Sequence, residues 1–431
     1  MPKAKKLMGV QQVLLHPSPE DEAILRYLCE QSGATYNSGM YFARQTYFKT
    51  KKILTGKFDL IYEPSVSKSL TAQSMPSSPL QQTLMSVIEA WKSYKSLKSL
   101  YFKGQLDFRP KPPNYLEGSK LFKVAYTNGR KQGASVEGCV LRLSLGLTVK
   151  RWFGVSEILL PMPSNLDASR VKEFTILPKN GSFYLECSYE VPKEDHDLDP
   201  ALALGIDLGT SANIAACVDT LGNSFLVDAF QMKSMNQWWN KQVSTTKEDK
   251  TGDYWSSKLD KTTQKRNHQM RDGVNKAAKL IVDHAIKHGL GNIVCGWGEG
   301  FKINSNMGRV NNQKFVQMPL AKLRDRISQL CEKHGIRFET TEEAYTSKAS
   351  FIDSDSLPKF GEKPDGWQAS GKRVRRGLYR TKDGSMINAD LNGAANILRK
   401  VASNLGLDLS RVGRQCLTTA SRIRLWESPT V

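Results

Sequence analysis

The feature that most constrains this sequence is the succession of apolar segments after residue 200. Residues 201–209 (ALALGIDLG) have the pattern of a buried strand. Residues 213–218 (NIAACV) and 224–230 (SFLVDAF) predict two more strands, joined by a turn at Asp219–Asn223. Helices and strands then alternate, at about 255–288, 292–297, 318–334, 336–341 and 390–402. Three successive strands followed by this alternation predict a mixed α/β domain.

Asp207 ends the first of these strands, in a chain whose order of elements is that of an RNase H-like domain. An aspartate at this position presents its carboxylate at the edge of the sheet, and Gly209 lets a substrate backbone approach closely. The short motif G-x-D-x-G also fits an actin-like ATPase or a plain turn at the end of a strand. The ATPase predicts a second glycine-rich phosphate loop, and no convincing one is found.

Asp390 is the second acidic candidate. It lies in INADLNGAANILRK (387–400), where Asn388 or Asp390 can begin a helix whose apolar face faces the core. An aspartate here can be an ordinary helix cap. Together with Asp207 it is also what two-metal hydrolysis requires, because carboxylates from separate elements can hold two Mg²⁺ ions about 4 Å apart.

The charge of the chain indicates a polyanionic partner. It has 62 Lys and Arg against 42 Asp and Glu, a net charge of +20. Phosphates of nucleic acid neutralise such an excess and release counterions on binding. No apolar run approaches the roughly 18 residues of a membrane span, and residues 1–15 lack the apolar core of a signal peptide. The 7 cysteines are scattered, as in reduced proteins. We therefore expect a soluble, cytoplasmic, nucleoid-associated bacterial protein with no membrane partner.

The first half of the chain has a different pattern. A strand at 7–16 is followed by helical periodicity over 19–55 and about 80–103, and a proline-rich stretch at 105–117 ends the helical part. Short alternating segments from 120 to about 192 predict a small β-barrel or sandwich. An acidic linker follows at 193–200.

Three segments together resemble the TnpB nucleases, relatives of the type V CRISPR effectors and of Fanzor proteins: GIDLG (205–209), YTSKASF (345–351) and NADLNGAANILRK (388–400). The resemblance implies a RuvC-like nuclease domain of RNase H-like fold in the C-terminal half, and a WED-like β-barrel with inserted REC-like helices in the N-terminal half. It also implies an RNA-guided DNA endonuclease whose partners are a guide RNA and double-stranded target DNA. Its cofactor would be two Mg²⁺ ions, with Mn²⁺ able to substitute.

On this resemblance we assign the segments of the chain as follows: 1–18, first barrel strand; 19–118, helical insert; 119–200, remaining barrel and linker; 201–344, nuclease core; 345–387, basic nucleic-acid-loading insert; 388–402, final nuclease helix; 403–431, C-terminal tail.

The sequence departs from the family pattern at the third carboxylate. Family members usually carry a glutamate directly after the strand that here ends Ile-Val-Cys-Gly at Gly296. We favour Glu343 as its replacement, since a glutamate relocated to this place is known in a TnpB branch and in Fanzors. Glu299 and the lack of any third carboxylate are the alternatives. Glu342 would point to the opposite face of a continuing strand.

A second departure concerns zinc. Relatives commonly carry two C-x-x-C pairs in the region that here spans 345–389, where this chain has no cysteine, so no structural zinc is expected. The region is instead basic, and we expect it to contact DNA phosphates, although a solvated loop is the alternative. The candidate contacts are Lys348, Lys372, Arg373, Arg375, Arg376 and Arg380.

The predicted function is therefore RNA-guided cleavage of DNA beside a short recognition motif, with Asp207, Glu343 and Asp390 as metal ligands. Two alternatives remain: a nuclease-dead, RNA-guided DNA-binding regulator, which the missing acid at Gly296 favours, and a compact CRISPR-associated type V effector.

Overall fold

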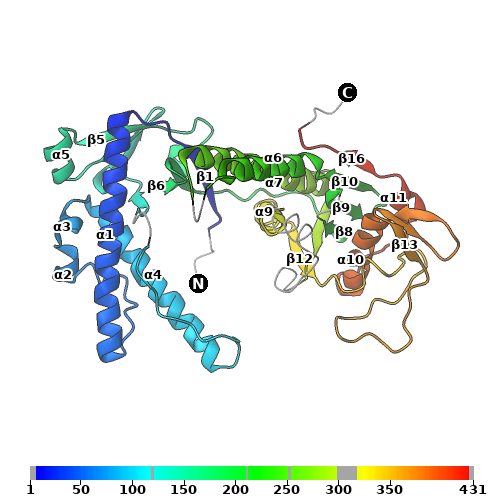
Figure 1. Ribbon diagram of the computed structural model, residues 1–431. Coiled ribbons are helices and arrows are strands. Elements are labelled where there is room, and N and C mark those ends of the chain that lie inside the picture. Colours follow the sequence, from blue (N-terminus) through cyan, green and yellow to red (C-terminus); the bar gives the residue numbers. More distant parts are fainter. Residues whose placement is uncertain (1–5, 118–120, 210–211, 251–253, 299–317, 427–431) are drawn as a thin grey trace. The chain divides into compact units, whose positions relative to one another are not determined.

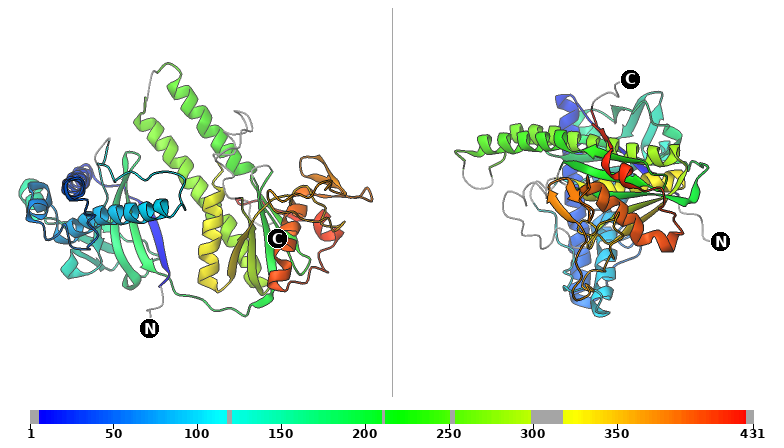
Figure 2. Two further views of the ribbon diagram at one scale, coloured as in Figure 1. Left: turned by 90° about the horizontal axis from the view of Figure 1, so that it is seen from below. Right: turned by 90° about the vertical axis from the view of Figure 1, so that its right-hand side faces the viewer.

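The computed structural model describes residues 6–117, 121–209, 212–250, 254–298 and 318–426. The chain divides into two compact units, Met1–Val191 and Pro192–Val431. Figure 1 labels many of their helices and strands, and Figure 2 shows two further views. None of the described helices is both long and apolar enough to cross a bilayer.

The first unit combines two antiparallel sheets with a set of helices inserted between its first two strands. Its strands are β1 (Met8–Leu14), β2 (Val124–Thr127), β3 (Ala134–Glu137), β4 (Val140–Ser144), β5 (Glu157–Pro161), β6 (Val171–Lys179) and β7 (Ser182–Glu190). Its α-helices are α1 (Pro19–Thr50), α2 (Pro64–Ser67), α3 (Leu70–Gln73), α4 (Ser77–Phe102) and α5 (Leu147–Phe153). One sheet has the order β1-β7-β6-β2 and the other β3-β4-β5. Buried residues of both sheets share one core with residues of α1.

Helix α1 begins where the sequence favours it. The Ser18 side chain accepts a hydrogen bond from the Asp21 backbone N–H, and Pro19 occupies the first helical position. The helix ends at Lys51, which adopts a left-handed conformation. It packs against α4 around Trp91, which is fully buried. The α1–α4 pair is thus held by an aromatic core of its own.

The second unit is built on a six-stranded mixed sheet. Its strands are β8 (Asp199–Leu208), β9 (Asn213–Asp219), β10 (Ser224–Asp228), β11 (Leu290–Gly296), β12 (Arg337–Thr341) and β16 (Ser421–Ile423), in the order β12-β11-β8-β9-β10-β16. The pairs β8–β9 and β9–β10 are antiparallel, whereas β11 runs parallel to both β8 and β12, and β16 runs parallel to β10. The predicted order of three strands followed by alternating helices and strands is therefore present.

Helices cover both faces of this sheet. Helices α6 (Phe230–Lys247), α7 (Ser257–Lys287) and α9 (Leu320–His334) share a core with Leu204 and Ile206 of β8. Helices α10 (Ala389–Leu405) and α11 (Arg414–Thr418) share the opposite core with Ala203 of the same strand. Because side chains alternate along a strand, Asp207 lies on the α10 face. In Figure 2, α6 and α7 run side by side.

Two expectations about regular structure were wrong. The strand predicted at 224–230 ends at Asp228, and Phe230 already begins α6. The segment 345–387, for which the sequence predicted no helix or strand, contains most of a three-stranded antiparallel sheet of β13 (Lys372–Arg375), β14 (Leu378–Arg380) and β15 (Met386–Asn388). Its strands have only three or four residues and many charges, so they lack the apolar alternation that predicts a strand.

Candidate active site

Asp207 reaches its position because two glycines let α10 lie directly on β8. A Cβ atom on Gly205 would stand 2.7 Å from the Ala394 carbonyl oxygen, and one on Gly393 would stand 2.4 Å from Oδ2 of Asp207. Real Cβ atoms do not approach other atoms so closely. The helix therefore passes over the strand at the place where the Asp207 carboxylate needs room.

Asp390 lies in the first turn of α10 but is not its cap. The Asn388 side chain accepts hydrogen bonds from the backbone N–H groups of Asp390 (2.9 Å) and Leu391 (3.1 Å), so Asn388 is the N-cap. The Asp390 carboxylate instead accepts from Asn213 Nδ2 (3.0 Å) and from the Arg373 guanidinium (3.1 Å). The ordinary capping role is thus filled by its neighbour, and Asp390 is turned toward groups from β9 and β13.

Glu343 follows β12, whose Thr341 pairs with Gly296 of the parallel strand β11. A Cβ atom added to Gly296 would lie 3.0 Å from both Cγ and Oε1 of Glu343, and 2.5 Å from Ile397 Cδ1. The Glu343 side chain therefore fills the space into which a side chain at position 296 would extend.

Glu342, one of the two other glutamates that the sequence raised, binds groups outside this arrangement. Glu342 accepts hydrogen bonds from Lys400 Nζ (2.9 Å) and from the Phe360 backbone N–H (3.2 Å). Glu299 lies outside the described residues.

The electrostatics of the site are those of acids brought together without sufficient positive charge. Burial raises the pKa of Asp207 well above its ordinary value, the Glu343 and Asp390 carboxylates raise it further, and Arg373 lowers it in part. Burial also raises the pKa of Glu343, to about 7. The interactions that shift the pKa of Asp207 show that Glu343 and Asp390 lie near it and act on the same charge.

This donor set fits divalent cations. Hard cations such as Mg²⁺ prefer carboxylate and amide oxygens, and a bound cation would stabilise the ionised form of each acid. Besides the three carboxylates, Oδ1 of Asn213 is buried without a hydrogen-bond partner in the described structure. Sequence reasoning missed Asn213. The available signal was a polar residue at the start of a segment that is apolar over the next five residues.

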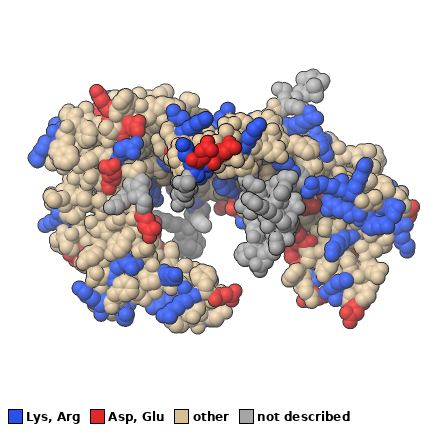
Figure 3. Space-filling model, viewed as in Figure 1, with Lys and Arg blue, Asp and Glu red and all other residues tan. Residues whose placement is uncertain are grey.

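The predicted nucleic-acid contacts surround this site only in part. Lys372, Arg373 and Arg375 lie exposed on β13, Arg376 is exposed in the following turn, Arg380 is half-buried on β14, and Lys348 is exposed after Glu343. Figure 3 shows Lys and Arg side chains gathered over the part of the second unit where Figure 1 labels β13 and α11. Of the six, Arg373 is the one whose side chain pairs with a candidate acid.

Two buried asparagines, also missed from the sequence, attach the YTSKASF segment to α10. Asn392 Nδ2 donates to the Ala349 carbonyl (2.8 Å), and its Oδ1 accepts from the Phe351 N–H (2.9 Å). Asn396 Nδ2 donates to the carbonyls of Thr346 (2.9 Å) and Ala349 (2.8 Å). Their spacing of four residues in an apolar helix face was the available signal, because buried amides need partners.

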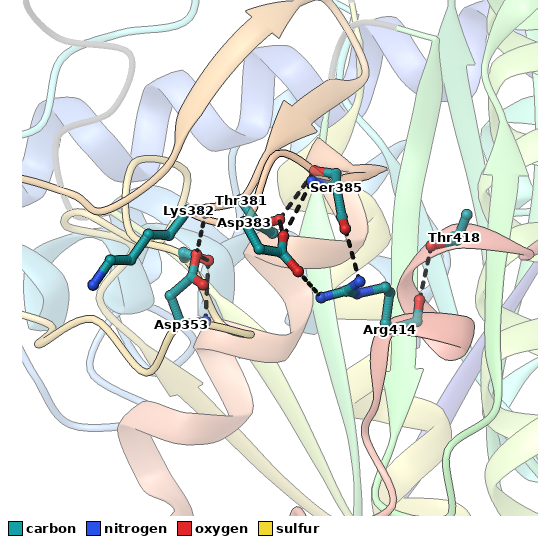
Figure 4. A network of polar contacts seen from close by, with 8 residues as sticks. Asp353, Thr381, Lys382, Asp383, Ser385, Arg414 and Thr418 are labelled. Atoms are coloured by element: carbon teal, nitrogen blue, oxygen red, sulfur yellow. Dashed lines mark hydrogen bonds and ion pairs between the residues drawn. The ribbon is translucent and has the colours of Figure 1, made fainter.

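A polar network occupies two short segments of the cysteine-free region 345–389, around Ala349–Asp353 and around Tyr379–Asp383 (Figure 4). At the first, Asp353 accepts from Ser350 Oγ (2.6 Å) and from the backbone N–H of Lys382 (2.9 Å). At the second, hydrogen bonds from Thr381, Ser385 and Arg414 hold the pKa of Asp383 well below its ordinary value. Hydrogen bonds thus join this segment to the β14–β15 turn and to α11.

Comparisons with known proteins agree with this organisation. A family model described as "Probable transposase" (OrfB_IS605) matches residues 186–297, and one described as "Cas12f1-like, TNB domain" matches 321–397. The TnpB-like protein ORF457 of Acidianus two-tailed virus is 24% identical over 419 residues, which cover 90% of this chain and 85% of that protein. Together these matches support a TnpB-family protein. The resemblance drawn from the sequence motifs is therefore confirmed.

The fold of this chain is similar to that of Cas12f1. The protein in a cryo-EM structure of a Cas12f1–sgRNA–target DNA complex has a TM-score of 0.59 and 17% identity, over 88% of this chain and 83% of that one. The region matched by the first family model contains Asp207 and Asn213, and the region matched by the second contains Glu343, Arg373 and Asp390.

Proposed function

We propose that this protein is an RNA-guided DNA endonuclease whose active site consists of Asp207, Glu343 and Asp390. The observation that carries the proposal is the effect of Glu343 and Asp390 on the charge of the buried Asp207, although the three acids come from β8, the end of β12 and the start of α10. Membership of the TnpB family supports a nuclease, and the guide RNA and target DNA in the related Cas12f1 complex support the two nucleic-acid partners.

The proposal assigns a role to each part of the chain. Residues 201–344 and 388–402 form the RuvC-like core, and 345–387 load nucleic acid. Residues 1–18 and 119–200 form a WED-like barrel, and 19–118 are REC-like helices. The first unit supports this by its order, since α1 to α4 lie between β1 and β2.

Within the core, some residues would bind the cations and others position the acids that bind them. Glu343 and Asp390 both act on the charge of Asp207, so these three acids would hold divalent cations together. Asn213 and Arg373 hold the Asp390 carboxylate at its two oxygens. Bound Mg²⁺ ions would supply a water of lowered pKa and would stabilise the leaving oxygen.

Glu343 distinguishes a nuclease from a guided binder without cleavage. The interpretation as a guided binder depends on Gly296, which stands where TnpB nucleases usually have an acid. The Glu343 side chain fills the space beside that glycine, and this supports the nuclease.

The test uses the adjacent glutamates as a matched pair. The full-length protein is purified with its copurified RNA, that RNA is sequenced, and a matching DNA duplex is offered with Mg²⁺. Glu343→Gln and Asp207→Asn are expected to lower the cleavage rate at least about 100-fold, because each removes a metal-holding charge. Glu342→Gln is expected to stay within a few-fold of the parent protein.

Target binding is measured on the same duplex. If Glu343→Gln cleaves as fast as Glu342→Gln, the assignment of the third acid is wrong. If the unaltered protein binds the matched duplex and does not cut it, the regulator is the better description. Sequences of the copurified RNA that derive from a CRISPR array would favour the type V effector instead.

A further inference from the structure

A second set of metal-binding side chains lies outside the candidate active site. Glu194 and His196 belong to the segment that precedes β8, and His334 is the last residue of α9. The Glu194 Oε2 atom lies 3.3 Å from His334 Nδ1 and 3.9 Å from His196 Nε2, and the two imidazole nitrogens are 2.9 Å apart. Three potential ligand atoms thus face one another.

These side chains are held from both directions. The Glu194 backbone N–H donates to the Lys333 carbonyl (2.8 Å), which fixes the segment to the end of α9. The helix ends at His334 because Gly335 adopts a left-handed conformation and its N–H donates a hydrogen bond to the Cys331 carbonyl. Lys333 Nζ binds Oε1 of Glu194 (2.8 Å), so Oε2 is the oxygen that faces the histidines. The side chains of His334 and His196 are only 12% and 27% exposed.

The separations suit a small tetrahedral ion. Zinc bonds to imidazole nitrogen and carboxylate oxygen are about 2.0–2.2 Å long, which places the ligand atoms of a tetrahedral site about 3.3–3.6 Å apart. The observed separations of 2.9, 3.3 and 3.9 Å lie on both sides of that range. Two imidazoles with one carboxylate favour Zn²⁺ over Mg²⁺, which prefers oxygen ligands alone. The negative end of the α9 dipole also favours a cation here.

We propose that Glu194, His196 and His334 form a Zn²⁺ site, with water as the fourth ligand. The site differs from the zinc position of relatives, since it lies outside residues 345–389. An ion here would join the segment leading into β8, which carries Asp207, to the helix leading into β12, which Glu343 follows. Those two strands lie on either side of β11. The site would thus stabilise the sheet on which two of the candidate acids depend.

The test is a Co²⁺ titration of the full-length protein after treatment with a chelator, in excess Mg²⁺ to occupy oxygen-only sites. Co²⁺ in a tetrahedral site with nitrogen ligands gives intense visible absorption, which Zn²⁺ then displaces. We expect one equivalent to bind, and His334→Gln and His196→Gln each to weaken binding about 100-fold or more. Zinc should also raise the Tm of the parent protein and leave that of His334→Gln unchanged.

Two variants serve as controls. His16→Gln removes an exposed histidine from the other unit, and Cys139→Ser removes an exposed thiol that could bind Co²⁺. Both are expected to keep the full absorption. The proposal is overturned if the parent protein gives no tetrahedral spectrum, if the spectrum survives in a His196→Gln/His334→Gln double variant, or if Cys139→Ser abolishes it. Far-UV circular dichroism of each variant separates ligand loss from misfolding, and Glu194→Gln provides a third ligand variant. Cleavage is not the readout, so the result is independent of the proposed nuclease activity.

Discussion

Individual side chains in the candidate site depend on neighbours that carry no charge. Asp207 has room because Gly393 has no Cβ atom, and Glu343 has room because Gly296 has none. Asp207 and Asp390 could be singled out from the sequence by their position at the ends of apolar segments. Gly393 could not, since its importance comes from the distance between α10 and β8, which no local pattern contains.

Gly393→Ala tests this requirement for space. A methyl group would collide with the Asp207 carboxylate, so we expect the cleavage rate to fall at least about 10-fold. The free energy of unfolding should fall by less than this loss of activity would require if it came from unfolding. Gly413→Ala is the matched control, because no atom lies within 4 Å of a Cβ built there. Cleavage rates and Tm are measured for both. Full activity in Gly393→Ala would show that the Asp207 carboxylate need not occupy its observed position.

The pKa of Glu343 predicts a dependence of stability on pH in the protein without divalent ions. Burial raises this pKa from 4.5 to about 7, so the unfolded chain releases the proton at a lower pH than the folded protein. The stabilisation from the protonated form is therefore complete below pH 4.5 and is lost as the pH rises toward 7, by up to roughly 3 kcal/mol. Urea unfolding of the parent protein and of Glu343→Gln at pH 5 and pH 8 measures this change in the free energy of unfolding.

In that comparison the parent protein should lose more unfolding free energy between the two pH values than Glu343→Gln does. Added Mg²⁺ should reduce the difference, because it binds the ionised acids. Equal losses in the two proteins would contradict the raised pKa.

Among the elements, helix α10 does the most to organise the site. It carries Asp390, provides the glycine above Asp207 and holds residues 346–351 through Asn392 and Asn396. Its long apolar periodicity made it predictable, as were β8 to β12 of the central sheet. The three-residue strand β16 was not predicted, because it lies in the segment assigned as a C-terminal tail and is too short to show alternation. The β13–β15 sheet was not, because its register depends on turns at Gly377 and Gly384 and on packing of Tyr379 and Ile387 rather than on alternation.

Asn392→Ala should weaken this attachment. It leaves the Phe351 N–H without its acceptor and removes one of the two amide donors to the Ala349 carbonyl, at a cost of about 1–3 kcal/mol of unfolding free energy. Asn404→Ala, an exposed position on the same helix, is the control and should change stability by less than about 0.5 kcal/mol. Chemical denaturation gives both values. A loss in Asn392→Ala no larger than the control's would mean that the segment is held by other contacts.

The whole molecule carries a net charge of +20, which predicts that its partner is nucleic acid. The structure shows that part of this charge is exposed on β13 and the turn after it. The division at Val191 could be anticipated from the acidic linker, whereas the helices α2 and α3, each of four residues, are too short to show a period.

Neutralising three exposed charges together, in Lys372→Gln/Arg375→Gln/Arg376→Gln, tests whether this surface binds DNA. Each lost phosphate contact to single-stranded DNA lowers the slope of log affinity against log salt by about 0.7, so the slope should fall by about 2. A charge-keeping variant, Lys372→Arg/Arg375→Lys/Arg376→Lys, should retain the parent slope. An unchanged slope in the neutral variant would mean that these three side chains are exposed to solvent and do not contact DNA phosphates.

The side chain of Glu343 beside Gly296 also bears on how relatives of this protein are sorted. A screen that required an acid at the alignment column of Gly296 would set this chain aside as inactive. Two parallel strands end next to each other here, so an acid after either one can serve the same volume. Screening by position in space rather than by alignment column would return such chains to the set worth assaying.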